Sequence, residues 1–309
     1  MKKMVFFIFL FIFIYSGFYI KLLSSKELDL SNLSNLNFEK AVYDYGRLLS
    51  LDIPEKEKLN IIKKYKNFFS NKNETLLILM YHDFYRDSRD TMKKYSVTVE
   101  DFENHLQILK ELNFESVSMM DVYYYVKFGK KIPERSVLLT FDDGYKKFMY
   151  IYPILKKYGY KGVISLITGY VGSSWELNKD QIKLLKEEGL VEFASHSDKI
   201  HNEFKKMLQN KKYDEIEKDI KKSRDFFNSM NIETIAFTYP LSYGSHDEKL
   251  QKILLKYGFK MAFSGWNDRY VKPNSNIFSI SRIEVSIRNG LNTKEKFKTF
   301  LLNYLKNKK

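Results

Sequence analysis

Short apolar runs recur along most of the chain, and the stretches between them repeat their apolar residues with helical spacing. Each run is short enough for a buried strand, and polar residues or glycine follow most of them. The predicted strands cover residues 76–81, 115–118, 136–141, 161–167, 191–194, 235–238, 260–263 and 278–285. Because strands that alternate with helices favour parallel βα units, the pattern predicts an α/β fold.

Helix boundaries between these runs carry recognisable signals. Thr98 with Asp101, and Asn178 with Gln181, have the spacing of capping boxes at helix starts. The glycines expected to end helices are Gly159, Gly189 and Gly258. In a β/α barrel the loops that follow the strands share one face. Polar side chains just past the strand ends are therefore expected to converge there.

The N-terminal region has a different pattern. Residues 4–20 form an apolar run of seventeen, preceded by two lysines and without a clear Ala-x-Ala cleavage site. This run is at the short limit for crossing a bilayer and is longer than a typical signal-peptide core. Its lack of charge argues against a buried core helix. We predict a signal anchor over residues 1–25, a stalk or helical appendage over 26–75, and a barrel-sized domain over 76–309.

Composition excludes some kinds of chemistry. The chain has no cysteine, so disulfides, thiolate ligands, a cysteine nucleophile and a lipoprotein anchor are excluded. A net charge of +14 would suit anionic walls, membranes or nucleic acid. However, the lysines are interspersed with acidic residues, as in residues 215–222, and no nucleic-acid-binding motif accompanies them. We interpret the charge as a solvated surface and expect no nucleic-acid partner.

Two adjacent carboxylates follow the predicted strand at 136–141. Asp142 and Asp143 precede Gly144, which permits a tight turn. Neighbouring carboxylates repel, so such a doublet is unfavourable unless a metal or a proton takes up the charge. The doublet therefore indicates two different chemical tasks. A solvated turn remains open as the alternative, because Asp-Asp-Gly is also good turn chemistry.

A second polar cluster, residues 195–202, follows the apolar run at 191–194 and contains His196 and His201. A spacing of five does not suit one helical face, which places the pair on a loop. Two imidazoles and one carboxylate leave open positions on a divalent ion, as in catalytic rather than structural metal sites. Two surface histidines without a ligand role are the alternative.

These motifs resemble those of the polysaccharide deacetylases of carbohydrate esterase family 4. Residues 140–145 are similar to that family's first motif, and residues 195–201 to its second. The resemblance implies a distorted (β/α) barrel and a divalent metal cofactor, zinc first, with cobalt or nickel as alternatives. It also implies that Asp142 is the general base and that Asp143, His196 and His201 are the metal ligands.

Two departures point to one branch of the family. The histidines of the second motif are usually four apart, whereas here they are five apart, as in the branch that deacetylates poly-β-1,6-N-acetylglucosamine. The family's acid histidine usually lies near the C-terminus, but no histidine follows His246. His82 ends a strand-like run that resembles the N-terminal motif of this circularly permuted branch. His82 is therefore the candidate acid, with a packing role or an ion pair with Asp83 as the alternative.

Residues 237–244 resemble part of the third motif, although three residues separate Pro240 from its glycine. The resemblance makes Tyr145, Tyr239, Pro240 and Tyr243 candidates for substrate contact, and buried packing is the alternative for the aromatic rings. Two further interpretations come from the residues themselves. Arg282 is a candidate partner for an active-site carboxylate. The two tryptophans, Trp175 and Trp266, are open to either sugar stacking or packing.

The function expected from the resemblance is metal-dependent N-deacetylation of poly-β-1,6-N-acetylglucosamine at the cell surface, in the maturation of a biofilm exopolysaccharide. The catalytic domain is expected outside the membrane, or secreted if the N-terminal segment is cleaved. The exopolysaccharide synthesis or export machinery is a candidate partner. Peptidoglycan or chitin oligomers are the alternative substrates, and an inactive polysaccharide-binding scaffold is the alternative class. A glycosidase is disfavoured, because it needs two carboxylates about 5 to 9.5 Å apart across the bond.

Overall fold

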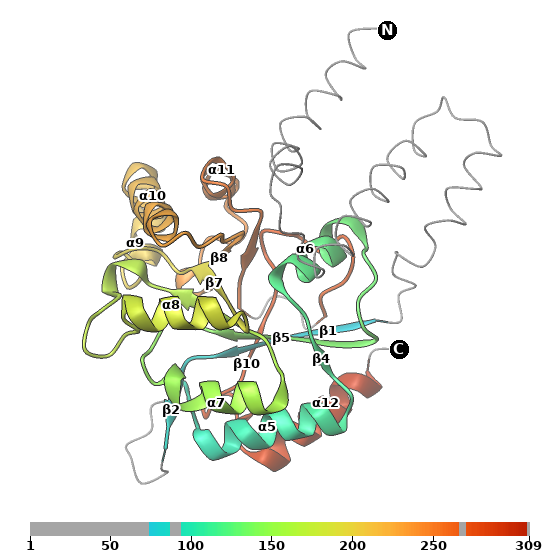
Figure 1. Ribbon diagram of the computed structural model, residues 1–309. Helices are drawn as coiled ribbons and strands as arrows, with labels where there is room; N and C mark the ends of the chain where they lie inside the picture. The colour runs from blue at the N-terminus through green and yellow to red at the C-terminus, as the bar shows by residue number, and fades with distance from the viewer. Residues whose placement is uncertain (1–73, 87–93, 266–269, 308–309) are drawn as a thin grey trace, which may run out of the picture. The chain divides into compact units, whose positions relative to one another are not determined.

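The computed structural model describes residues 74–86, 94–265 and 270–307, and its centre is a curled sheet of parallel strands (Figure 1). The sheet has eight strands, in the order β10-β1-β5-β6-β7-β8-β9, with β4 beside β5. Their bounds are β1 (Thr75–Tyr81), β4 (Glu115–Ser116), β5 (Arg135–Phe141), β6 (Gly162–Leu166), β7 (Val191–Ser195), β8 (Ala236–Thr238), β9 (Met261–Phe263) and β10 (Ile283–Glu284). Each of the eight predicted runs thus contains one strand.

The expected distorted barrel takes the form of a curled parallel half-barrel. The end strands β9 and β10 do not pair with each other. The chain just before β10 links the two ends instead, because Phe263 and Ile280 form a single parallel bridge. A separate parallel pair, β2 (Asp83–Tyr85) and β3 (Ser96–Thr98), was not predicted. Three-residue strands are too short to show a period in the sequence.

Helices follow most of the strands, as expected for βα units. They are α5 (Val99–Glu111), α6 (Met119–Phe128), α7 (Phe148–Tyr158), α8 (Lys179–Glu188), α9 (Phe204–Gln209), α10 (Tyr213–Ser229), α11 (Glu248–Lys256) and α12 (Lys294–Lys306). The predicted caps are confirmed: Thr98 accepts a hydrogen bond from the Asp101 amide, and Asn178 and Gln181 form a full capping box. In Figure 1, α5, α7 and α12 lie together along one face of the sheet.

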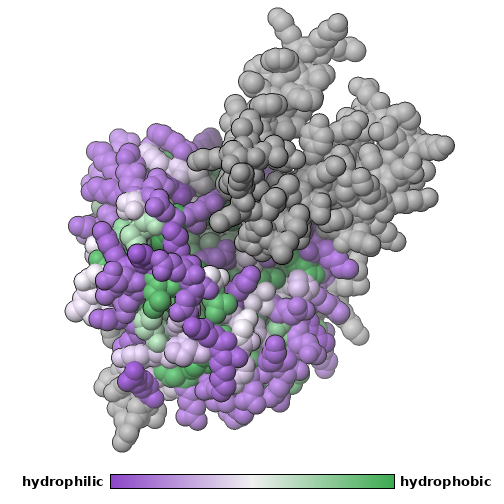
Figure 2. Space-filling model, viewed as in Figure 1, coloured by the Kyte–Doolittle hydropathy of each residue, from purple (hydrophilic) through white to green (hydrophobic). Residues whose placement is uncertain are grey.

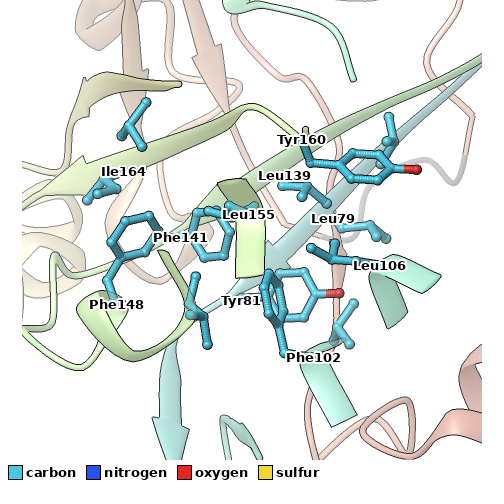
Figure 3. Close-up of a cluster of buried hydrophobic side chains, with 14 of the residues drawn as sticks. Leu79, Tyr81, Phe102, Leu106, Leu139, Phe141, Phe148, Leu155, Tyr160 and Ile164 are labelled. Atoms are coloured by element: carbon cyan, nitrogen blue, oxygen red, sulfur yellow. The ribbon is translucent and has the colours of Figure 1, made fainter. Parts of the chain in front are cut away.

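Alternate residues of the strands pack on opposite sides of the sheet. On the outer side, Leu79, Tyr81 and Phe141 pack with residues of α5 and α7 (Figure 3). Residues of α12 belong to the same cluster. On the inner side, Ile78 and Leu138 pack with the apolar face of α6. Fully burying one such side chain contributes roughly 1.5–3 kcal/mol to the free energy of folding. The apolar side chains on both sides of the sheet therefore stabilise it.

The inner register continues past the apolar core toward the carboxyl ends of the strands, where it becomes polar. Along β5 the inward residues run from Leu138 through Thr140 to Asp142, and along β7 they run from Ala194 to His196. The core of the half-barrel thus ends in a cluster of buried polar side chains. This cluster forms the candidate site described below.

The predicted anchor and appendage lie almost wholly outside the described residues, so their boundaries stay predictions. Among the residues that the structure describes, no helix is long and apolar enough to cross a membrane. The face shown in Figure 2 is largely hydrophilic, with small hydrophobic patches between the polar side chains.

Candidate active site

Three predicted metal ligands converge at the carboxyl ends of β5 and β7. The Nε2 atoms of His196 and His201 each lie 3.6 Å from Oδ1 of Asp143 and 3.1 Å from each other. Their possible donor atoms all fall within 4.8 Å of one another, so one ion can contact all three. Two imidazole nitrogens and one carboxylate oxygen suit a divalent transition metal and leave positions open for water or substrate.

The surroundings of His196 favour the protonation state that a metal ligand needs. Its Nδ1 donates a 2.8 Å hydrogen bond to the carbonyl oxygen of Thr238, which leaves the lone pair of Nε2 directed at the cluster. Burial, together with repulsion from His201, lowers the pKa of His196 to about 4. The ring is therefore neutral at physiological pH and available to bind a cation.

A buried carboxylate holds the loop between the two histidines. Asp219 of α10 accepts hydrogen bonds from the backbone amides of Asp198, Lys199 and Ile200 at 2.7, 2.7 and 3.2 Å. The loop also contains Ser197 at φ 71°, a conformation that residues other than glycine seldom adopt. Asp219 thus stabilises an unfavourable backbone that brings His201 back to His196. The sequence pattern did not identify Asp219, because it lies within an ordinary helical repeat.

The turn after β5 is strained in the same way. Asp143 has φ 73° and Gly144 has φ 81°, so the chain reverses sharply within the doublet. A side chain at Gly144 would come within 2.8 Å of both Glu176 and Leu166. Strain of this kind is held in place by its surroundings and is common at functional sites. Here it directs the side chains of Asp142 and Asp143 to different partners.

Asp142 forms a bidentate ion pair with Arg282, as the sequence analysis suggested. The two carboxylate oxygens accept hydrogen bonds of 2.7 and 2.8 Å from the two terminal nitrogens of the guanidinium group. Arg282 also donates to Thr140 and to the carbonyl oxygen of Ser264. Burial alone would raise the pKa of Asp142, but the charge of Arg282 holds it well below its usual range. Asp142 is therefore ionised and fixed in orientation.

His82 follows β1, in the same inward register as Ile78, and lies near this pair. Its charge contributes to the lowered pKa of Asp142, and its ring lies 5.4 Å from that of Tyr95. Within the described residues its buried Nδ1 has no hydrogen-bond partner. Asp83 instead accepts hydrogen bonds from the Phe84 amide and from Lys147. Since Asp83 is occupied elsewhere, the imidazole of His82 is not oriented by its neighbour.

The candidate substrate-contact residues fall into two groups. Tyr145 is half-buried, and burial together with the nearby charge of Asp143 raises the pKa of Tyr145, while Tyr243 is 39% exposed beneath the ammonium group of Lys205. Tyr239 is only 1% exposed and packs against Phe237, and Pro240 is buried as well. The structure therefore places Tyr239 in the core, which was the alternative interpretation of this ring, because it shares the outward register of Phe237 and packs with residues of α9 and α11.

Glu176 was not identified from the sequence. Its side chain is 1% exposed, and within the described residues neither of its carboxylate oxygens has a hydrogen-bond partner. Burial, together with the negative charge of Asp143, raises the pKa of Glu176 to about 9. A neutral acid therefore lies behind the metal-binding turn. Only the folding of residues 170–177 back onto that turn brings it there, so no local pattern could reveal it.

Comparison with known proteins identifies the family. The sequence profile of the polysaccharide deacetylases matches residues 129–262, which include all three converging ligands. Poly-β-1,6-N-acetyl-D-glucosamine N-deacetylase from Staphylococcus aureus is 31% identical over 83% of this chain and 85% of its own length. The enzyme of the same name from Staphylococcus epidermidis is 32% identical over 63% of this chain and 70% of its own. The chain belongs to the polysaccharide deacetylase family.

Solved structures agree with this membership. A Streptococcus pyogenes deacetylase in complex with acetate aligns with a TM-score of 0.62 and 27% identity, over 75% of this chain and 98% of its own. The structure of IcaB from Ammonifex degensii aligns with a TM-score of 0.63 and 20% identity, over 74% of this chain and 97% of its own, which supports the fold alone. Polysaccharide deacetylases hydrolyse carbon–nitrogen amide bonds, so the predicted enzyme class is confirmed.

Proposed function

We propose that this polysaccharide deacetylase is a metal-dependent N-deacetylase of a cell-surface N-acetylglucosamine polymer, specifically poly-β-1,6-N-acetylglucosamine. The observation that carries the proposal is the convergence of Asp143, His196 and His201 next to the Asp142–Arg282 pair. The names of the staphylococcal relatives support the choice of polymer. A role in maturing a biofilm exopolysaccharide follows from that substrate.

The donor set fits a divalent ion, with zinc as the first candidate and cobalt or nickel as alternatives. Asp143, His196 and His201 would hold it, and the hydrogen bond from His196 to Thr238 fixes the first ring in its ligand tautomer. A bound ion supplies Lewis acidity, which polarises the acetyl carbonyl and makes a water molecule more acidic. The remaining chemistry belongs to the side chains around the ligands.

In this proposal Asp142 takes the proton of the attacking water. Each carboxylate oxygen of Asp142 accepts one hydrogen bond from Arg282 with one lone pair, and its second lone pair can accept a proton. The ion pair makes Asp142 a weak base, so proton transfer requires a water that is already acidified. Arg282 thus fixes the orientation of the Asp142 carboxylate and, at the same time, lowers its basicity.

In this proposal His82 protonates the departing amine. The water oxygen bonds to the acetyl carbon, the carbon–nitrogen bond breaks, and the nitrogen takes a proton from the imidazolium group. Acetate and a free amine on the polymer are the products. The free Nδ1 of His82 and its proximity to Asp142 support this role. General acid catalysis of this kind typically contributes about a hundred- to ten-thousandfold to the rate.

The test is acetate release from defined β-1,6-linked and β-1,4-linked N-acetylglucosamine oligomers, with metal content measured on the same samples. We expect about one divalent ion per chain, faster release from the β-1,6 series, and loss of activity after chelation that added zinc restores. Faster release from the β-1,4 series would favour a chitin or peptidoglycan substrate. Full metal content without acetate release from either series would indicate a binding scaffold.

We further propose that the catalytic domain lies on the outer side of the membrane. The support is the charge-free run at residues 4–20, which two lysines precede. The exopolysaccharide synthesis or export machinery would then be the nearby partner. Protease treatment of intact cells tests this placement: an external domain is digested without lysis, whereas a cytoplasmic one is protected.

A further inference from the structure

Three aromatic rings lie next to one another beside the metal-binding turn. The ring of Trp175 lies 5.9 Å from that of Tyr145 and 5.5 Å from that of Tyr170, measured between ring centroids. Trp175 is 46% exposed, although an indole is among the most favourable side chains to bury. We call Tyr145, Tyr170 and Trp175 the aromatic platform.

One end of the platform is fixed to the turn that carries Asp143. The Lys146 amide donates a 2.9 Å hydrogen bond to the carbonyl oxygen of Trp175, and the Leu177 amide donates a 3.0 Å bond to that of Gly144. These bonds form an antiparallel bridge that turns Glu176 into the interior while Trp175 faces outward. Tyr145 is itself the partner of Glu176 in this bridge and follows Asp143 by two residues in the same turn.

The other end of the platform is fixed to the loop between His196 and His201. The Gly169 amide donates a 3.0 Å hydrogen bond to the carbonyl oxygen of Asp198, whose carboxylate accepts another from Thr168. Gly169 lies so close that an added Cβ would clash with this loop. Tyr170 donates to the carbonyl oxygen of Lys199 at 3.4 Å. The platform is therefore held at a constant distance from both parts of the metal site.

We propose that the aromatic platform is a stacking subsite for a sugar ring of the polymer next to the residue that is deacetylated. This inference rests on the proposed function, since it needs an N-acetylglucosamine polymer as the substrate. The faces of a pyranose ring carry C–H groups that pack well on aromatic rings, and an exposed indole offers the largest such surface. Rigid attachment to both metal-binding loops sets which ring along the chain lies over the metal site.

The platform predicts a dependence on chain length. Trp175→Ala should lower kcat/KM for a β-1,6-linked pentamer by about tenfold, mainly through KM, since aromatic contacts of this kind contribute roughly that factor. It should leave deacetylation of the N-acetylglucosamine monomer unchanged. Trp175→Phe, which keeps a ring, should recover most of the activity on the pentamer. Tyr150→Ala is the matched control, because Tyr150 is 37% exposed on α7 and outside the platform.

Pentamer binding measured by calorimetry separates this proposal from the proposed function. If the wild type releases no acetate from any oligomer, the proposed function fails, while weaker pentamer binding by Trp175→Ala than by Tyr150→Ala would still support the subsite. Equal pentamer binding by wild type and Trp175→Ala would overturn the subsite. Equal losses of activity on monomer and pentamer would overturn it as well. Circular dichroism of each variant, with Trp175→Phe as the conservative replacement, excludes loss of folding as the cause.

Discussion

The buried carboxyl group of Glu176 should destabilise the metal-free protein, and replacing it with glutamine should relieve this. Its pKa is raised from 4.5 to about 9, so at pH 7 the folded protein must keep a proton that the unfolded chain has lost. Keeping this proton in the folded state costs about 1.4 kcal/mol for each pH unit above 4.5, and pH 7 lies 2.5 units above that value. Glu176→Gln should therefore raise the free energy of unfolding at pH 7 by roughly 3–4 kcal/mol.

The effect has a definite sign with pH. A carboxyl group with a raised pKa in the folded state leaves wild-type stability highest below pH 4.5, and stability then falls as the pH rises toward 9. The difference between variant and wild type should accordingly be near zero at pH 4 and largest at pH 9. Urea unfolding in the presence of a chelator, at several pH values, measures this directly.

Glu187→Gln provides the control, because the Glu187 side chain is 62% exposed on the neighbouring helix α8. It should leave stability within about 0.5 kcal/mol of wild type at each pH. If Glu176→Gln behaves like this control, or if its advantage does not grow with pH, then Glu176 is not kept neutral by burial. In that case an ordered water or ion satisfies the carboxylate in the folded protein.

Four further predictions concern the site itself. His201→Ala should lose most of its bound metal, measured by elemental analysis, because two ligands hold an ion weakly; full occupancy would remove His201 from the ligand set. Asp142→Asn should keep the metal but lower kcat about a hundredfold or more, and equal metal loss would show that it is a ligand. His82→Ala should bind metal normally and slow turnover more than tenfold, whereas a smaller loss of turnover excludes it as the acid. Asp219→Asn should weaken metal binding about ten- to a hundredfold, measured by metal titration, although Asp219 is not itself a ligand. The substitution weakens the hydrogen bonds that hold the loop carrying His201.

Much of the site could be predicted because its residues extend the regular alternation of the strands. Inward positions two residues apart lead from Ile78 to His82, from Thr140 to Asp142 and from Ile280 to Arg282. The apolar runs therefore indicated both the parallel sheet and the edge where the polar residues meet. Asp142 directly follows β5 and Arg282 directly precedes β10, and only β1 lies between these two strands, so the long side chain of Arg282 can reach Asp142.

The rest depends on contacts that no local pattern encodes. Asp219 and Glu176 reach the site from a helix and a loop whose sequences look ordinary, and only tertiary packing gives them a role. Tyr239 could not be assigned to core or surface, because an aromatic ring at a strand end suits both. Its burial follows from the packing of β8 against α9 and α11, which the sequence of β8 alone does not contain.

The position of β10 beside β1 affects the order in which the enzyme can be completed during synthesis. β1 leaves the ribosome well before its partner strand and Arg282, which follow it in the sequence by most of the length of the domain. Until then β1 has an open edge, and the carboxylate of Asp142 has no counter-charge, which would destabilise a folded site by several kcal/mol. A chain that stops before β10 thus carries every proposed catalytic and metal-binding residue and still cannot form the site. Enzyme activity therefore requires that synthesis has proceeded past Arg282 and β10.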